Sequence, residues 1–214
     1  MRVGSGPRVP ADAGTGPATG GADAARGAGT MAGMSAWHAH DSRAVYENPW
    51  IRVREDVVTR PDGGEGVYGV VEVRSPAVFV VPVTDDDEVV LVEVERYTTG
   101  AVSLEVPAGG SDGEDPLVAA ARELREETGL AADDWTHLGP VFSLNGVAHA
   151  PGHVLLARGL RPADEAHAQD EEGIVGLRRV PWPGLLDLVR AGAITDNESL
   201  GALLHAAIAL GRVS

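Results

Sequence analysis

The order of strand-like and helix-like segments along the chain predicts a layered α/β fold. Strand patterns occupy much of residues 45–109, a helix pattern covers 116–128, and strand patterns return between 136 and 180. Two further helix patterns follow, and no segment repeats another. With 214 residues the chain is long enough to bury the core that such layers share.

The chain is strongly acidic and contains no cysteine. Its formal net charge is −15, and its pI is about 4.7. This charge argues against nonspecific binding to nucleic acid or to an anionic membrane surface. The sequence has no apolar run of membrane-spanning length and no convincing secretory signal, so we expect a cytoplasmic protein with neither nucleic acid nor membrane as a partner. Disulfide and thiol chemistry are excluded.

Composition divides the chain into three parts. Residues 1–35 are rich in Gly and Ala with few large apolar side chains, and we expect a disordered tail. Residues 36–75 carry N-terminal β-strand patterns, and residues 76–212 carry the main domain.

The N-terminal strand patterns predict a β-hairpin. Apolar residues alternate over 51–58 and 67–73, and the sequence Pro61-Asp62-Gly63-Gly64 between them is a turn signal. An isolated hairpin is marginally stable in water, so these strands need a surface to pack against.

The next two strands form the predicted centre of the sheet. Residues 77–83 are continuously apolar, as in a strand buried on both faces, and residues 88–94 supply a partner strand. Three aspartates, 85–87, separate the two segments. A solvated turn is the favoured interpretation of this triplet, and a metal site is the alternative.

The helix over 116–128 has a start and a stop signal. Asp115 is a good N-cap residue, Pro116 suits the first helical position, and Gly129 suits a left-handed C-terminal cap. Glu123, Glu126 and Glu127 stand at i, i+3 and i+4, so their carboxylates lie along one stripe of the helix and repel one another. A solvated acidic face is one interpretation. The other is a site for a hard divalent cation, which takes oxygen ligands.

After the helix, strand patterns occur at 136–144, 153–157 and 174–180, with a polar acidic loop at 161–173. Pro181-Trp182-Pro183 starts a helix that ends near Gly192. Thr195 and Glu198 have the spacing of a capping box for a last helix through residue 210.

The loop and helix together resemble the Nudix hydrolase signature, G-x5-E-x7-R-E-U-x-E-E-x-G-U with U aliphatic. The matching residues are Glu114, Arg122, Glu123, Leu124, Glu126, Glu127, Gly129 and Leu130. The loop departs from the signature, because only four residues separate Gly109 from Glu114 and the position that restores five is Ala108. The resemblance implies an α/β/α sandwich with a mixed β-sheet and an N-terminal β-hairpin extension.

The resemblance also implies a metal site. Mg²⁺ or Mn²⁺ would be held by Glu123, Glu126, Glu127 and the carbonyl oxygen of Ala108, with Glu126 and Glu127 counted as catalytic. Arg122 would then hold the ligands in place, because groups behind a metal's ligands orient them. Glu114 would steady the loop.

Residues outside the signature resemble the ADP-ribose and nucleotide-sugar pyrophosphatase branch, in which an Arg precedes a Glu-Leu-Pro-Ala-Gly turn. Here Arg96 precedes Glu105-Val106-Pro107-Ala108-Gly109. The branch implies substrate contacts at Arg96, Glu105 and Asn145, although Arg96 could equally pair with an acidic neighbour. Many branch members that act on ADP-ribose have a proline where this chain has Asn145.

The branch further implies a catalytic glutamate on the acidic loop and a homodimer built by the N-terminal strands. The glutamate would be Glu172, with Glu171 or Asp170 as alternatives. The expected reaction is Mg²⁺-dependent hydrolysis of a small-molecule nucleoside diphosphate derivative, of the ADP-ribose or nucleotide-sugar class, into two monophosphates. The alternatives are a non-catalytic nucleotide-binding regulatory module and a nucleoside triphosphate pyrophosphohydrolase.

Overall fold

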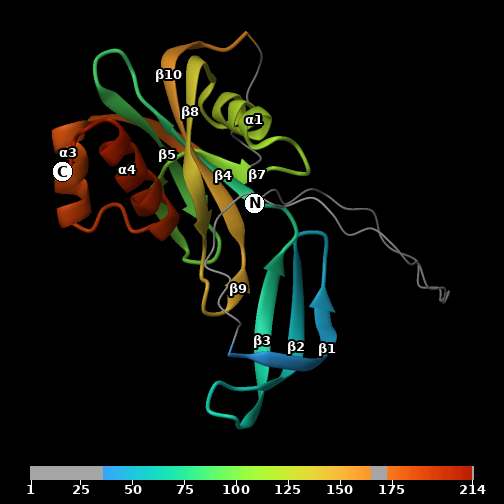
Figure 1. Cartoon of the computed structure of the whole chain (residues 1–214). Coiled ribbons are helices and arrows are strands. Elements are labelled where there is room, and N and C mark those ends of the chain that lie inside the picture. The colour runs from blue at the N-terminus through green and yellow to red at the C-terminus, as the bar shows by residue number, and fades with distance from the viewer. Residues whose placement is uncertain (1–35, 165–172, 214) are drawn as a thin grey trace.

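The computed structural model describes residues 36–164 and 173–213, which form a sheet-rich core with helices on two sides and a separate N-terminal sheet (Figure 1). The helix α1, Pro116–Thr128, covers one side of the core, and α3, Trp182–Arg190, and α4, Asn197–Ala209, lie on the other. This is the predicted α/β/α sandwich.

The sheet between the helices is mixed and has the strand order β7-β4-β10-β8. These strands are β7 (Ala108–Gly110), β4 (Ala77–Pro82), β10 (Pro151–Pro162) and β8 (Leu130–Phe142). β4 and β10 are parallel, and the other neighbours are antiparallel. Because β4 is apolar throughout, it is buried on both faces, as its sequence predicts.

A three-stranded antiparallel sheet adjoins this core, in the order β11-β5-β6. Its strands are β11 (Ile174–Pro181), β5 (Glu88–Arg96) and β6 (Ala101–Glu105). β6 ends three residues before β7 begins, so the chain turns a corner between the two sheets.

The core divides into two main clusters, one on each side of β4 and β10. Val78, Val80 and Leu155 pack with Leu124 of α1. Side chains on the opposite face of the same strands, such as Val81 and Leu156, pack with α3 and α4, where Leu203 of α4 is one of their partners. Alternation along the strands thus provides an apolar face for each helical layer.

The N-terminal sheet has the order β1-β2-β3-β9. It consists of β1 (His38–Glu47), β2 (Ile51–Thr59), β3 (Glu65–Val73) and the short β9 (Ala148–His149). The predicted hairpin is present as β2 and β3, and β1 is an additional strand. The Asn48 side chain accepts hydrogen bonds from the backbone N–H groups of residues 50 and 51, which closes the turn before β2.

Two elements differ from the sequence-based predictions. The N-cap of α4 is Asp196 and not Thr195, because the Asp196 carboxylate accepts the hydrogen bond from Ser199 N, 2.7 Å. β8 begins at Leu130, directly after the helix stop, and is therefore longer than the predicted strand. Its first residues pair with the far end of β10, which no local pattern reports.

The predicted tail at 1–35 and most of the acidic loop, 165–172, lie outside the described residues. Within the described part, no helix has the length and apolarity needed to cross a membrane.

Candidate active site

The helix α1 presents the three signature carboxylates at the edge of the core. The Asp115 carboxylate accepts a hydrogen bond from Leu117 N, 2.9 Å, and Gly129 takes the left-handed conformation with φ of 68°. Leu124 and the alanines before it bury the apolar face of the helix against β4 and β10. The neighbouring stripe of glutamates therefore faces the loop that precedes the helix.

Two of these glutamates are buried. Glu123 is 4% exposed and Glu127 is 6% exposed. Glu127 Oε2 accepts a hydrogen bond from Ala108 N, 2.9 Å, which ties the helix to the start of β7. A Cβ atom at Gly109 would lie 2.2 Å from the Glu123 carboxyl carbon, so a side chain at this position would displace the Glu123 carboxylate from its present place.

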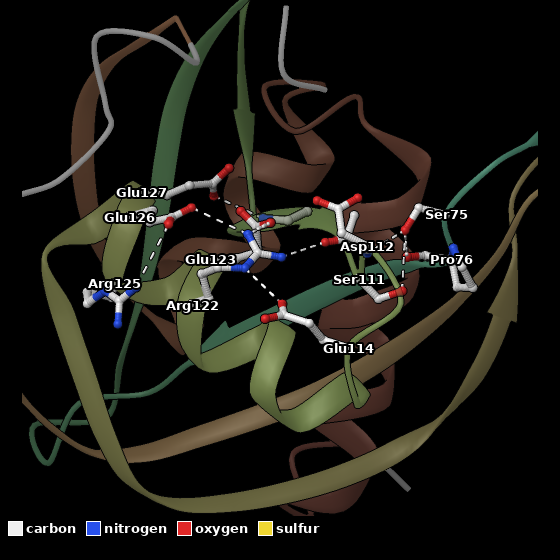
Figure 2. Close-up of polar contacts among 12 residues, drawn as sticks. Ser75, Pro76, Ser111, Asp112, Glu114, Arg122, Glu123, Arg125, Glu126 and Glu127 are labelled. Atoms are coloured by element: carbon white, nitrogen blue, oxygen red, sulfur yellow. Dashed lines mark hydrogen bonds and ion pairs between the residues drawn. The ribbon is translucent and has the colours of Figure 1, made fainter. Parts of the chain in front are cut away.

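Arg122 lies at the centre of the carboxylates (Figure 2). Its Nε donates to Glu114, 2.9 Å, its Nη1 donates to Glu123, 2.6 Å, and its Nη2 donates to the Gly110 carbonyl, 2.8 Å. Burial acts to lower the pKa of Arg122, but the hydrogen bond to Glu114 and the charge of Glu123 outweigh burial and raise that pKa. Arg122 thus fixes the loop and the helix to each other, as predicted for it and for Glu114.

Glu126 completes the cluster from the next turn of α1. Its carboxylate lies 3.4 Å from Arg122 Nη1 and 3.8 Å from Arg125 Nη2. Because the glutamates turn toward Arg122, Arg125 and the Ala108 amide, their oxygens do not converge. No three His, Cys, Asp or Glu side chains within 36–164 and 173–213 are grouped as metal ligands.

The loop between β7 and α1 is tied to the end of the N-terminal sheet. Asp112 N donates to Ser75 Oγ, 2.6 Å, and Ser111 N donates to the Pro76 carbonyl, 2.7 Å. Asp112 and Gly113 both have positive φ, 50° and 85°. These two left-handed residues let a loop that is one residue shorter than the signature still reach the helix start.

The corner before β7 has its own anchor on α4. Val106 N donates to Ser199 Oγ, 3.0 Å, and Ser199 is 1% exposed. On the other side, Val80 N donates to the Pro107 carbonyl, 2.8 Å. The backbone just before Ala108 is therefore held by α4 through Ser199 and by β4 through Val80.

Arg96 and Glu105 bind each other. Arg96 Nε donates to Glu105 Oε1, 3.0 Å, and Nη2 donates to Oε2, 2.5 Å, in a bidentate pair. This hydrogen bond, with the charges of Glu105 and Glu127, raises the pKa of Arg96. Of the two alternatives for Arg96, the structure contains the acidic neighbour, while a third of the side chain stays exposed for another contact.

A pocket of about 540 Å³ opens between the N-terminal sheet and the carboxylate cluster. One wall has Trp50, Ile51 and Arg74, and the other has Phe79 and the backbone of residues 108–110. Arg122 and Glu123 also line it. A ligand in this pocket would contact an aromatic ring, a guanidinium group and the signature loop together.

Two family models match the sequence. A NUDIX domain matches residues 73–202, and a nucleoside diphosphate sugar hydrolase N-terminal domain matches residues 37–71. The chain belongs to the Nudix family. It is a Nudix hydrolase, and hydrolysis of nucleoside diphosphate-linked compounds is the function that the family and its relatives support.

Individual Nudix relatives have different names. An ADP-ribose pyrophosphatase of Mycobacterium tuberculosis (strain ATCC 25618 / H37Rv) is 33% identical over 165 residues, 76% of this chain and 79% of the relative. A methanol dehydrogenase activator of Bacillus methanolicus is 30% identical over 163 residues, 75% of this chain and 87% of the relative. The crystal structure of an ADP compounds hydrolase has a TM-score of 0.72 at 24% identity and covers 83% of this chain and 97% of its own, which shows the shared Nudix fold.

The remaining predicted residues lie outside this cluster. Asn145 lies in the exposed turn between β8 and β9 and does not line the pocket. Glu171 and Glu172 lie outside the described residues. Gly173, which follows Glu172 in sequence, accepts a hydrogen bond from Glu95 N, 2.8 Å, beside Arg96.

Sequence reasoning missed the wall that the N-terminal sheet contributes to the Nudix pocket. Trp50 and Arg74 are 24 residues apart in sequence, and no local pattern joins them. The one available signal was a tryptophan next to a turn in a chain with four tryptophans. Ser75 and Ser199 gave no signal, since each acts on a backbone N–H group that is distant in sequence.

Proposed function

We propose that this Nudix hydrolase cleaves the diphosphate of a nucleoside diphosphate linked to a sugar, with ADP-ribose as a leading member of the class, and releases two monophosphates. The observation that carries the proposal is the pocket that Trp50 and Arg74 line together with Arg122 and Glu123. An indole suits the face of a nucleobase, and a guanidinium suits a phosphate oxygen. The ADP-ribose pyrophosphatase name of one relative agrees with this substrate class.

Nudix hydrolases generally need a divalent metal, and the residues present suit Mg²⁺ or Mn²⁺. Glu123, Glu126, Glu127 and the Ala108 carbonyl would hold the ion, since hard cations prefer oxygen ligands. Two features support this donor set. Glu123 and Glu127 are buried carboxylates on one stripe of the same helix, and such a cluster of like charges favours a divalent cation. Gly109 also keeps the space beside Glu123 open.

The metal would supply charge neutralisation for the diphosphate and activate a water molecule. Arg122 holds the carboxylates in a fixed position relative to the loop. This matters because phosphoryl transfer depends mainly on positioning and electrostatic stabilisation. Arg96, held by Glu105, presents its exposed edge to a phosphate oxygen. Glu172, or else Glu171, takes the proton from the attacking water as general base. The hydrogen bond from Glu95 N to the Gly173 carbonyl places Gly173, the residue after Glu172, next to the strand that carries Arg96.

We also propose a cytoplasmic homodimer that forms through the N-terminal sheet. Paired positions on one face of β2 and β3 are apolar, among them Val57 opposite Val67 and Ile51 opposite Val73. Val67 is 67% exposed and Val57 is 45% exposed. Ile51 and Val73 also line the pocket, so a partner on this face would border the substrate. Light scattering should give twice the monomer mass at micromolar concentration.

A regulatory function is the second candidate, and the name of the methanol dehydrogenase activator favours it. That candidate predicts nucleotide binding with little turnover. The complete set of signature carboxylates favours catalysis instead, because binding alone does not require Glu126 or Glu127.

The deciding experiment incubates the full chain with ADP-ribose, nucleotide sugars, dinucleoside polyphosphates and nucleoside triphosphates, each with Mg²⁺, Mn²⁺ or chelator. We expect AMP and ribose 5-phosphate from ADP-ribose and loss of activity in chelator. Glu172→Gln should lower kcat and leave KM nearly unchanged, since its role lies in the chemical step. Dominant release of pyrophosphate from a triphosphate would overturn the substrate class, and full activity in chelator would overturn the metal.

A further inference from the structure

Two histidines that do not line the Nudix pocket lie against each other on adjacent strands. His137 belongs to β8 and His153 to β10, and His137 Nε2 lies 3.0 Å from His153 Nδ1. The ring centroids are 5.1 Å apart, and the ring planes are tilted by 46°. The two residues are 16 positions apart in sequence, so strand pairing brings them together and not a local motif.

A bulge in β8 puts the two rings on the same face of the sheet. β8 has one extra residue, Leu138, next to the pairing of His137 with Leu155. Without the bulge, His137 would lie opposite the next residue of β10 and would point to the other face from His153. With the bulge, His137 lies diagonally across from His153, within reach of a long side chain. Gly139, with φ of 143°, supplies a backbone conformation that other residues rarely adopt.

The separation of the two ring nitrogens suits two ligands of one metal ion. Histidine nitrogens bind Zn²⁺ at about 2.0 to 2.1 Å. Two such nitrogens at a right angle or at the tetrahedral angle are therefore about 2.8 to 3.4 Å apart. The 3.0 Å between His137 Nε2 and His153 Nδ1 lies within this range. A rotation of the two rings would direct both lone pairs at one ion, in place of the proton that neutral imidazoles share.

The surroundings of His153 favour the form that binds a metal. Imidazole must be neutral to coordinate an ion. Burial, together with the nearby His137, lowers the pKa of His153, so this ring is largely neutral at pH 7. Asp115, at the start of α1, is close enough for its negative charge to act on His153. That charge favours a cation beside the ring.

The imidazole pair and the carboxylate cluster suit different classes of metal. Imidazole suits Zn²⁺, Ni²⁺ and Cu²⁺, whereas Mg²⁺ takes oxygen ligands. The chain has no cysteine, so no thiolate competes with the histidines for a transition metal. Excess Mg²⁺ should therefore fill the proposed carboxylate site and leave the histidine pair free for another ion.

We propose that His137 and His153 form a second metal site, for Zn²⁺ or a neighbouring divalent transition-metal ion, separate from the proposed Mg²⁺ site. The two imidazoles are the protein ligands, and water fills the other coordination positions. The ion links β8 to β10 across the bulge, near the carboxylate that caps α1. The site does not depend on the proposed hydrolase activity.

The test titrates Zn²⁺ into the full chain at pH 7.5 in excess Mg²⁺, followed by isothermal titration calorimetry. His137→Gln and His153→Gln should each raise the Kd for Zn²⁺ at least about 10-fold, since even the loss of a group behind a metal ligand has an effect of this size. The double variant should bind about as weakly as either single variant, because one imidazole alone cannot chelate an ion. Such non-additivity indicates that both residues act on the same ion. His137 is exposed, so His137→Gln should keep the fold, as circular dichroism would verify.

His149→Gln and His40→Gln are matched controls. Both histidines are exposed, with His149 on β9 and His40 on β1, where its ring is hydrogen-bonded to Thr59. Each control variant should keep the wild-type Kd. An unchanged Kd in both pair variants, an equal loss in the control variants, or no Zn²⁺ binding by the wild type would each overturn the proposal. Hydrolysis of ADP-ribose with Mg²⁺ alone tests the proposed function separately.

Discussion

Two clusters of arginines and carboxylates in this protein differ in their balance of charge. On the N-terminal sheet, three guanidinium groups and three carboxylates form ion pairs: Arg52, Arg54 and Arg74 with Glu47, Asp56 and Glu72. At the signature loop, two guanidinium groups face three carboxylates: Arg122 and Arg125 with Glu114, Glu123 and Glu126. Glu127 adds a fourth carboxylate next to the second cluster.

The difference teaches how a structural cluster can be distinguished from a candidate cation site. The sheet cluster carries no surplus charge, and its buried carboxylate, Asp56, has a guanidinium partner in Arg54. The loop cluster keeps a surplus of negative charge, and two of its members, Arg122 and Glu123, line the pocket. The surplus negative charge attracts a divalent cation. A cation held there would in turn attract a diphosphate to an otherwise acidic protein.

The largest effect is expected when charge is removed from the loop cluster. Glu127→Gln keeps the shape of the side chain and should lower turnover with Mg²⁺ at least about 100-fold, the scale for loss of a metal's electrostatic contribution. Steady-state rates across a Mg²⁺ titration would measure this. Near-normal turnover at every Mg²⁺ concentration would contradict a ligand role for Glu127, provided that circular dichroism shows an intact fold.

A smaller effect is expected at the arginine that holds the cluster. Arg122→Lys keeps the charge and loses the fork that binds Glu114, Glu123 and the Gly110 carbonyl together. Activity should fall about 10- to 100-fold, with a higher Mg²⁺ requirement, as when an orienting group behind metal ligands is lost. An unchanged Mg²⁺ requirement would show that Arg122 only stabilises the loop.

The balanced cluster should respond in stability and not in rate. Glu72→Gln removes the carboxylate that accepts a hydrogen bond from Arg54 Nε, 2.9 Å. Glu72 does not line the pocket that contains Arg122 and Glu123. A partly exposed pair contributes up to about 1 kcal/mol, so the melting temperature should drop by roughly 2 °C with kcat unchanged. A change in Mg²⁺ dependence in this variant would remove the distinction between the two clusters.

The smallest effect concerns His137 and His153, on adjacent strands, whose ring nitrogens lie 3.0 Å apart. Burial, together with the nearby His137, lowers the pKa of His153 below 6.5, against the opposing charge of Asp115. Between the lowered pKa and 6.5 the unfolded chain binds more protons than the folded one, so stability should fall as the pH drops through this window. His153→Gln should reduce the loss of melting temperature between pH 7.5 and 5.5, and His149→Gln, at an exposed position, should not.

Local signals account for what the sequence could predict. The cap at Asp115, the stop at Gly129 and the periodicity between them define α1 and the stripe of glutamates without any tertiary information. The continuous apolar run of β4 likewise indicated a central strand. These features depend on residues that are neighbours along the chain, where propensity and spacing act directly.

The remaining features depend on contacts between distant residues. The bond from Val106 N to Ser199 Oγ joins residues 93 positions apart, and the pocket wall of Trp50 and Arg74 forms only when β2 and β3 have paired. Asp196 rather than Thr195 caps α4 because its carboxylate is the group within reach of Ser199 N. A capping pattern restricts the start of a helix to a few residues, and tertiary packing selects one of them.

The connection between the N-terminal sheet and the core has a consequence for the kinetics of substrate capture. Only residues 74–76 separate β3 from β4, and all three are bonded: Arg74 N to the Trp50 carbonyl, Ser75 Oγ to Asp112 N, and the Pro76 carbonyl to Ser111 N. A hinge needs residues whose backbone angles can change without breaking contacts, and each of the three residues 74–76 makes a hydrogen bond that such a change would break. The pocket between the N-terminal sheet and the carboxylate cluster should therefore be open to solvent before substrate arrives. Its association rate should then be set by diffusion and orientation, without a preceding domain-closing step.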